Sequence, residues 1–213
     1  MSLTRKVLSV SVSVLALASA VVQAAPVLTI TGGTTSSLSN IGFDPNWFGG
    51  SSAYSGFSLS NQQIGGVLSV DSYSNATFTY LGKEAAYNNA FLDFKVGSTP
   101  VGSFTTNGSA PGSFFSVAGV SAGALNFGFK SNLEPQLFGN GSNAVGVILS
   151  TNKQSALLLF NDKGGDRDYD DMVVKVSFTS AVPEPQTYAM LLAGLGLMGA
   201  VAMRRRKPKA LAA

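Results

Sequence analysis

The residues best suited to chemistry form an acidic stretch between two apolar segments, 156–160 and 172–178. This stretch contains five of the 11 acidic residues in the chain, and it reads Asp162-Lys163-Gly164-Gly165-Asp166-Arg167-Asp168-Tyr169-Asp170-Asp171. Carboxylates this close together repel one another, so their concentration needs a physical reason. A hard divalent cation supplies one, because calcium takes about six to eight oxygen ligands from carboxylates, carbonyls and water.

The spacing of the aspartates favours a short calcium-binding loop. Alternate residues of an extended segment project to the same side, and D-x-D-x-D spacing with nearby glycines is typical of such loops. Gly164 and Gly165 would allow the sharp turn that brings the first aspartate toward the later ones. We therefore predict a structural calcium site with Asp171 as a ligand or a turn cap, and with four ligands, Asp162, Asp166, Asp168 and Asp170.

Three other interpretations of the loop stay open. The first needs no metal: Arg167 pairs with an aspartate, and Asp170 or Asp171 caps a turn. The second is phosphoryl transfer to an aspartate, although the α/β framework that this chemistry uses is missing from the pattern. The third is a polysaccharide hydrolase, which needs two carboxyl groups about 5 to 9.5 Å apart in a sugar-binding cleft.

The composition excludes several classes of catalytic site. The chain has no histidine and no cysteine. It therefore cannot use Ser-His-Asp or Cys-His catalysis, zinc bound by histidine, or imidazole acid–base chemistry. Without disulfides, the fold must be held by its core, its sheet hydrogen bonds or a metal.

The elements that must position the acidic loop are short strands. Turn-forming residues recur about every eight to twelve residues, which is typical of an all-β sandwich or barrel. In 77–80 the aromatics Phe78 and Tyr80 share one face, and in 125–130 the apolar residues alternate in the same way. We expect an all-β fold, a β-sandwich of jelly-roll-like or Ig-like type, with further strands at 27–31, 66–70, 90–96, 113–117, 145–150, 156–160 and 172–178.

The only tryptophan, Trp47, lies in a predicted loop between Phe43 and Phe48. Aromatic residues in such a loop commonly plug the end of a core, but an exposed tryptophan also stacks on sugar rings. The second use gives an alternative function, a calcium-assisted carbohydrate-binding module in which Trp47 contacts exopolysaccharide.

Both ends of the chain have the composition of targeting segments. Residues 1–24 have the pattern of a signal peptide: Arg5 and Lys6, an apolar run, and small residues before a cleavage site after Ala24. At the other end, an apolar helix is expected at 188–203, followed by a basic tail at 204–209. We expect this helix to be a transmembrane helix, although its length of roughly 24 Å is short against a hydrocarbon core of about 30 Å.

The C-terminal segment 183–213 resembles the PEP-CTERM protein-sorting signal, also called the ice-binding protein C-terminal domain. The resemblance is carried by Pro183-Glu184-Pro185, the apolar helix, and Arg204, Arg205 and Arg206. It implies recognition by an exosortase, a membrane enzyme that cuts near the motif. The loop sequence from Gly165 to Val174 also resembles an acidic hallmark of domains that accompany this signal, which again implies calcium.

The charge of the chain belongs mainly to its ends. Seven of the 14 basic residues lie in segments 1–24 and 183–213, but only one of the 11 acidic residues does. The domain between them, 25–182, is therefore acidic, and nucleic-acid binding is not expected. We expect a non-enzymatic envelope or biofilm-matrix protein, held at the inner membrane before processing and then at the cell surface or outside the cell, with exopolysaccharide as a further partner.

Overall fold

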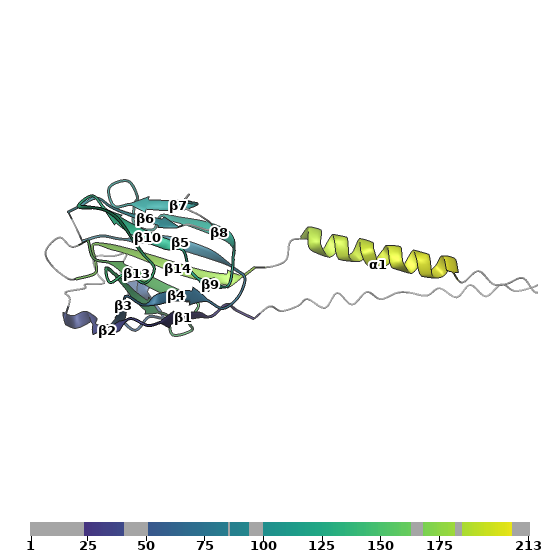
Figure 1. Ribbon diagram of the computed structural model, residues 1–213, viewed down its shortest axis with the longest axis horizontal. Helices are drawn as coiled ribbons and strands as arrows, with labels where there is room; N and C mark the ends of the chain where they lie inside the picture. Colours follow the sequence, from purple (N-terminus) through teal and green to yellow (C-terminus); the bar gives the residue numbers. More distant parts are fainter. Residues whose placement is uncertain are drawn as a thin grey trace, which may run out of the picture.

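The computed structural model describes residues 24–40, 51–84, 86–93, 100–162, 168–181 and 185–205. Most of the regular structure is β-sheet, as predicted (Figure 1). Two short 3-10 helices, η1 (Leu38–Asn40) and η3 (Ser51–Tyr54), interrupt the strands. The strands are β1 (Leu28–Thr31), β2 (Thr34–Ser37), β3 (Asn61–Ile64), β4 (Val67–Val70), β5 (Ser74–Gly82), β6 (Asn89–Asp93), β7 (Gly102–Thr105), β8 (Phe114–Val120), β9 (Gly123–Ala124), β10 (Phe127–Ser131), β11 (Glu134–Gly139), β12 (Val145–Leu149), β13 (Ser155–Phe160) and β14 (Met172–Ser180).

The strands form three antiparallel sheets. The largest has seven strands in the order β2-β3-β12-β13-β14-β5-β8. A four-stranded sheet has the order β11-β10-β6-β7, and a three-stranded sheet the order β1-β4-β9. The all-β fold class is thus confirmed. The more specific jelly-roll-like or Ig-like type stays a prediction.

One hydrophobic core joins all three sheets. Leu68 from the three-stranded sheet, Phe91 from the four-stranded sheet and Val174 from the seven-stranded sheet belong to the same buried cluster. Phe91 contacts Phe78 across the core, with ring centroids 5.3 Å apart. The predicted inward alternation is confirmed, because Phe78, Tyr80, Leu125, Phe127 and Phe129 all lie in this cluster.

The two central strands of the large sheet, β13 and β14, are buried on both faces. Leu158 and Val174 point into the shared core, whereas Leu157 and Val173 belong to a second cluster on the other face. That cluster is completed by residues from outside the central strands, among them Leu38 and Tyr54. A strand covered on both sides reads as a continuous apolar run, which explains the sequence of β13. The hairpin that carries the acidic loop is therefore tightly held.

All nine segments predicted to be strands contain strands. Five further strands were not predicted: β2, β3, β7, β9 and β11. These strands are short or polar, or contain a helix- and sheet-breaking residue, as β11 does at Pro135. Their sequences lack the apolar alternation by which a half-buried strand is recognised.

The two ends of the described β-structure lie side by side. The Ser180 hydroxyl donates a hydrogen bond of 3.1 Å to the carbonyl oxygen of Ala24. The chain then continues to helix α1 (Pro185–Arg205), where a proline at the first helical position is well tolerated. The predicted signal peptide, residues 1–24, lies outside the described residues apart from Ala24.

The expected helix at 188–203 is present within α1, but its expected transmembrane character is corrected. Within the described ranges of the chain, no helix combines the length and the apolar character needed to cross a membrane. The physical reason lies in its composition, because glycines and alanines occupy many of its positions and contribute little apolar surface. Large residues such as Met190 and Leu197 are exposed.

The turn at Gly32 and Gly33 connects β1 to β2 and lies close to Gly66, the residue before β4. Both glycines have a positive φ, 70° and 81°. A Cβ at position 32 would meet nothing within 4 Å, but at position 33 it would lie 2.7 Å from the backbone nitrogen of Gly66. Gly32→Ala should lower the free energy of unfolding by about 1–2 kcal/mol through backbone strain alone. Gly33→Ala should lower it by about 1–3 kcal/mol more, because backbone must move.

Urea denaturation of the full chain measures both effects, and Gly32→Ala is the matched control. Equal losses of stability in the two variants would contradict the close approach of the Gly33 and Gly66 backbones.

Candidate metal centre

The acidic loop closes the hairpin between β13 and β14. Phe160 pairs with Met172, so Asp162 lies two residues and Asp171 one residue beyond a fixed pair in the sheet. The backbone N–H of Asp162 donates a 2.7 Å hydrogen bond to Oδ2 of Asp171. This bond draws the two ends of the loop together, and both aspartates are buried, with exposed fractions of 0% and 4%.

Asn89, the first residue of β6, ties this loop to the four-stranded sheet. Its amide Nδ2 donates to Oδ2 of Asp162 at 2.9 Å and to the carbonyl oxygen of Asp171 at 3.4 Å. Asn89 is fully buried. The first bond satisfies part of the hydrogen-bonding capacity of the buried Asp162 carboxylate without a cation, and the second holds the backbone of Asp171.

Strand pairing also brings Glu84 to the loop. β5 pairs with β14, and Gly82 at the end of β5 lies opposite Val173 at the start of β14. Two residues beyond Gly82, the N–H of Glu84 donates a 3.0 Å hydrogen bond to the carbonyl oxygen of Asp170. Glu84 therefore sits beside the acidic loop although it is far from it in the sequence.

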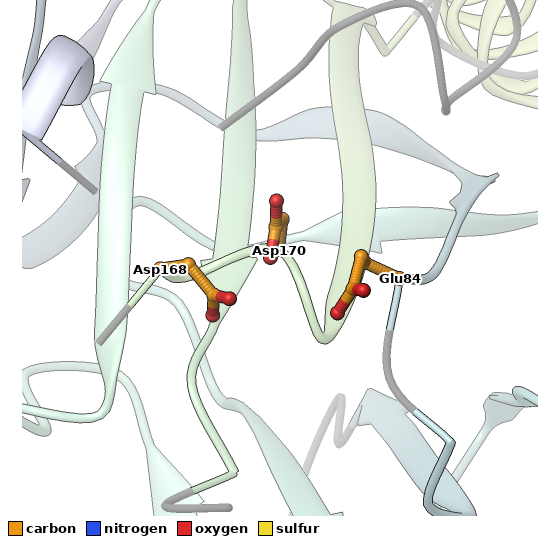
Figure 2. A group of neighbouring side chains, drawn as sticks. All are labelled: Glu84, Asp168 and Asp170. Carbon is orange, nitrogen blue, oxygen red and sulfur yellow. The ribbon is translucent and has the colours of Figure 1, made fainter. Parts of the chain in front are cut away.

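Three carboxylates meet at this point. One oxygen from each of Glu84, Asp168 and Asp170 lies within 4.8 Å of the other two. In Figure 2 the Asp168 and Glu84 carboxylates come from separate segments and turn toward one another, with Asp170 between them. Calcium–oxygen distances of about 2.3–2.6 Å place two ligands of one ion at most about 5 Å apart, so the three oxygens fit a single calcium ion.

Asp170 is the buried member of the group. Its exposed fraction is 4%, and its Oδ1 is buried without a hydrogen-bond partner in the described structure. Burial is the largest of the effects that raise the pKa of Asp170 to about 8. The charge of Asp168, a hydrogen bond with Asp168, and the charges of Glu84 and Asp171 act in the same direction. A carboxylate held this way is costly to ionise unless a cation is close.

Tyr169 fixes the backbone between Asp168 and Asp170. Its φ is 59°, a left-handed conformation that is uncommon for an aromatic residue. The ring is buried in the second core cluster, and its hydroxyl donates a 2.7 Å hydrogen bond to the carbonyl oxygen of Asn143. Packing of the side chain thus stabilises a strained backbone at the carboxylate group, and such strain is commonly found at functional sites.

The structure separates the predicted ligands into two sets. Asp168 and Asp170 meet in the carboxylate group, whereas Asp162 and Asp171 form the hydrogen bonds at the base of the loop. Asp166 lies outside the described residues, as does Trp47, the predicted sugar contact.

Glu84 and Asn89 were missed as parts of this site. Glu84 is one of few acidic residues outside the loop, and it closely follows a predicted strand. That signal alone does not show which strand pairs with β14, and only this pairing places Glu84 beside Asp170.

A second functional region begins where the domain ends, at the C-terminal side of β14. A family model described as the PEP-CTERM protein-sorting motif matches residues 181–207. The chain carries a PEP-CTERM sorting motif. This motif implies export, processing by an exosortase and membrane-associated processing toward the cell surface. No curated protein matches the chain, and no solved structure does.

The residues of the PEP-CTERM motif are only partly described. Pro183 and Glu184 lie outside the described residues, and Pro185 begins α1. Arg204 and Arg205 are the last residues of α1, and Arg206 lies outside the described residues. The match nevertheless spans all six of these predicted signal residues.

Processing through this motif can be tested directly. Replacing Pro183-Glu184-Pro185 by alanines should leave an unprocessed precursor, because the enzyme would lose the segment that it recognises. Immunoblotting of the native host's membrane and extracellular fractions measures this. Pro208→Ala is the matched control, since it changes a proline just beyond the matched residues. Normal processing of the triple variant would refute recognition through Pro183-Glu184-Pro185.

The raised pKa of Asp170 predicts an unusual pH dependence of stability. In EDTA, folded Asp170 keeps its proton up to about pH 8, whereas an unfolded aspartate loses it near pH 4. The folded chain then binds more protons than the unfolded chain, so the free energy of unfolding should fall as pH rises toward 8. Burial also raises the pKa of Asp93 to about 6. Loss of the Asp93 proton therefore lowers the free energy of unfolding mainly below pH 6, outside the range in which Asp170 acts.

Urea denaturation between pH 6.5 and 8 isolates the contribution of Asp170. Asp170→Asn should remove the decline over this range. Asp71→Asn should retain it, because Asp71 is exposed and its hydrogen bonds to the Val27 N–H and the Ser72 hydroxyl lower its pKa. A decline that persists in Asp170→Asn would contradict the buried, proton-retaining carboxyl.

Proposed function

We propose that this protein is a non-enzymatic component of the envelope or extracellular matrix, sorted by an exosortase and stabilised by a structural calcium ion. The calcium ligands are Glu84, Asp168 and Asp170. The single observation that carries this proposal is the meeting of their three carboxylate oxygens within 4.8 Å of one another.

Calcium suits this group better than a smaller cation. The protein supplies three carboxylates from two separate segments, and calcium accepts irregular sets of about six to eight oxygens, with carbonyls and water completing the shell. Magnesium requires a near-ideal octahedron at about 2.0–2.1 Å. By analogy with extracellular calcium modules, we expect a dissociation constant of about 0.1 to 1 mM.

The ion would join two connections at one end of the domain. Asp168 and Asp170 belong to the β13–β14 connection, and Glu84 belongs to the β5–β6 connection. Without a cation their charges repel, and the raised pKa of Asp170 expresses that repulsion together with burial. Bound calcium would let Asp170 ionise beside the other two carboxylates and would hold the two connections together.

The position of the site supports a role on the outer side of the processed protein. β14 runs for nine residues from Met172, beside the carboxylates, to Ser180, just before the PEP-CTERM motif (Figure 1). At about 3.3 Å per residue, the site lies roughly 30 Å from the point where the sorting segment begins. A calcium-stabilised end facing away from the processing site suits contact with matrix polymers such as exopolysaccharide.

Two observations favour a structural over a catalytic role. The sequence has no histidine or cysteine. The carboxylate oxygens lie within 4.8 Å of one another, a separation suited to one cation, whereas glycoside hydrolysis uses carboxyl groups about 5 to 9.5 Å apart on either side of a sugar.

Calcium should stabilise the folded chain in a concentration-dependent manner. Because a ligand that binds only the folded state adds RT ln(1 + [L]/Kd), 10 mM calcium should add about 1.4–2.7 kcal/mol for the expected range of Kd. Thermal melts of the purified full chain in EDTA and across a calcium series measure this. Glu84→Gln and Asp168→Asn should each reduce the calcium-induced rise in Tm.

Two controls make the melt specific. Asp71→Asn removes an exposed carboxylate that is not part of the group and should keep the full response. Magnesium at the same concentration should produce a smaller rise. A flat response to calcium in the unmodified chain, or an undiminished response in Glu84→Gln, would refute the site.

A further inference from the structure

A small cavity lies at the end of the domain opposite the carboxylate group. It has a volume of about 100 Å³. Phe178, near the end of β14, and Ala76, near the start of β5, line it, together with Val120 and Leu125. The rim is formed by exposed residues of the β8–β9 connection, Ser121 and Ala122 among them. The cavity is therefore independent of the proposed calcium site.

Asp93, the last residue of β6, is the one acidic residue in the wall of this cavity. Its exposed fraction is 6%. Burial is the cause of its raised pKa, and in the described part of the chain no group donates a hydrogen bond to its carboxylate. A carboxyl group that is buried beside an accessible cavity and has no hydrogen-bond donor among the described residues is costly, which marks it as a candidate binding group.

We propose that this cavity binds a primary ammonium group on a short unbranched stem, with Asp93 as the counter-ion. The carboxylate would accept a charge-assisted hydrogen bond from the ammonium. The buried rings of Phe78 and Phe178 line the same cavity and favour a cation over a neutral group. Apolar walls such as Leu125 would pack against the stem, and the small volume excludes bulky ligands.

The surroundings suggest two sources of such a group. The cavity lies at the end of β14 from which the chain continues to the PEP-CTERM motif, so it is at the end of the domain that adjoins the sorting segment in the chain. Aminophospholipid headgroups present a primary ammonium on a two-carbon stem. Amino sugars of a matrix polymer present the same charged group on a ring carbon, without an unbranched stem, so they fit the small cavity less well.

Ethylammonium is the simplest probe of the cavity. Titration into the full chain should shift the NMR signals of the Leu125 and Val120 methyl groups. A three-atom ligand cannot bind more tightly than a dissociation constant of roughly 1 mM, so the titration must extend to tens of millimolar. Asp93→Asn, which keeps the shape of the side chain, should weaken binding about tenfold or more. Phosphoethanolamine should then produce the same shifts, whereas glucosamine should not, and equal binding of glucosamine would contradict the requirement for an unbranched stem.

Three controls test whether the carboxylate and the cavity act together. Ethanol, the neutral analogue, should produce little shift at the same concentrations. Asp71→Asn should bind normally, because it removes an exposed carboxylate outside the cavity. Ala122→Trp should block the rim while leaving Asp93 in place, which keeps the test valid if Asp93→Asn fails to fold. Equal shifts from ethanol, or unchanged binding in Ala122→Trp, would overturn the proposal.

Discussion

The structure depends on the antiparallel pairing of β13 with β14 and of β14 with β5. These strands lie at the centre of the seven-stranded sheet, and β13 and β14 are buried on both faces. Their apolar residues supply much of the hydrophobic stabilisation in a chain that has no disulfide. The same pairing fixes where each connection lies, so the geometry of the acidic loop follows from the packing of the core.

Against this rigid base, the acidic loop concentrates unfavourable charge. The structure accommodates these carboxylates in two ways. At the base of the loop, Asn89 donates a hydrogen bond to the carboxylate of Asp162, and the backbone N–H of Asp162 donates one to the carboxylate of Asp171. Farther out, Asp168, Asp170 and Glu84 converge, and Asp170 stays protonated to about pH 8 when no cation is near. The proposed calcium ion is the charge that this outer group lacks.

The domain also has two distinct ends. The carboxylate group lies near the start of β14, and the PEP-CTERM motif follows its end. The small cavity around Asp93 lies at the second end. The signal for export and sorting is thus a short linear segment, whereas the two proposed binding sites depend on strands that are distant in sequence and adjacent in space.

The sequence by itself determined the local properties of this protein. Some features depend only on a few neighbouring residues, so they could be predicted from the sequence. They are the alternation of Phe78 and Tyr80, the apolar run of β13 and the composition of the sorting motif. Short polar strands such as β2 and β11 were missed, because their place in the sheets depends on partners rather than on their own side chains. The sequence also marked the aspartates of the loop but could not divide them into two sets. Only the tertiary structure decided that Glu84 joins Asp168 and Asp170 and that Asp93 faces a cavity, because strand register sets these distances and register depends on the whole core.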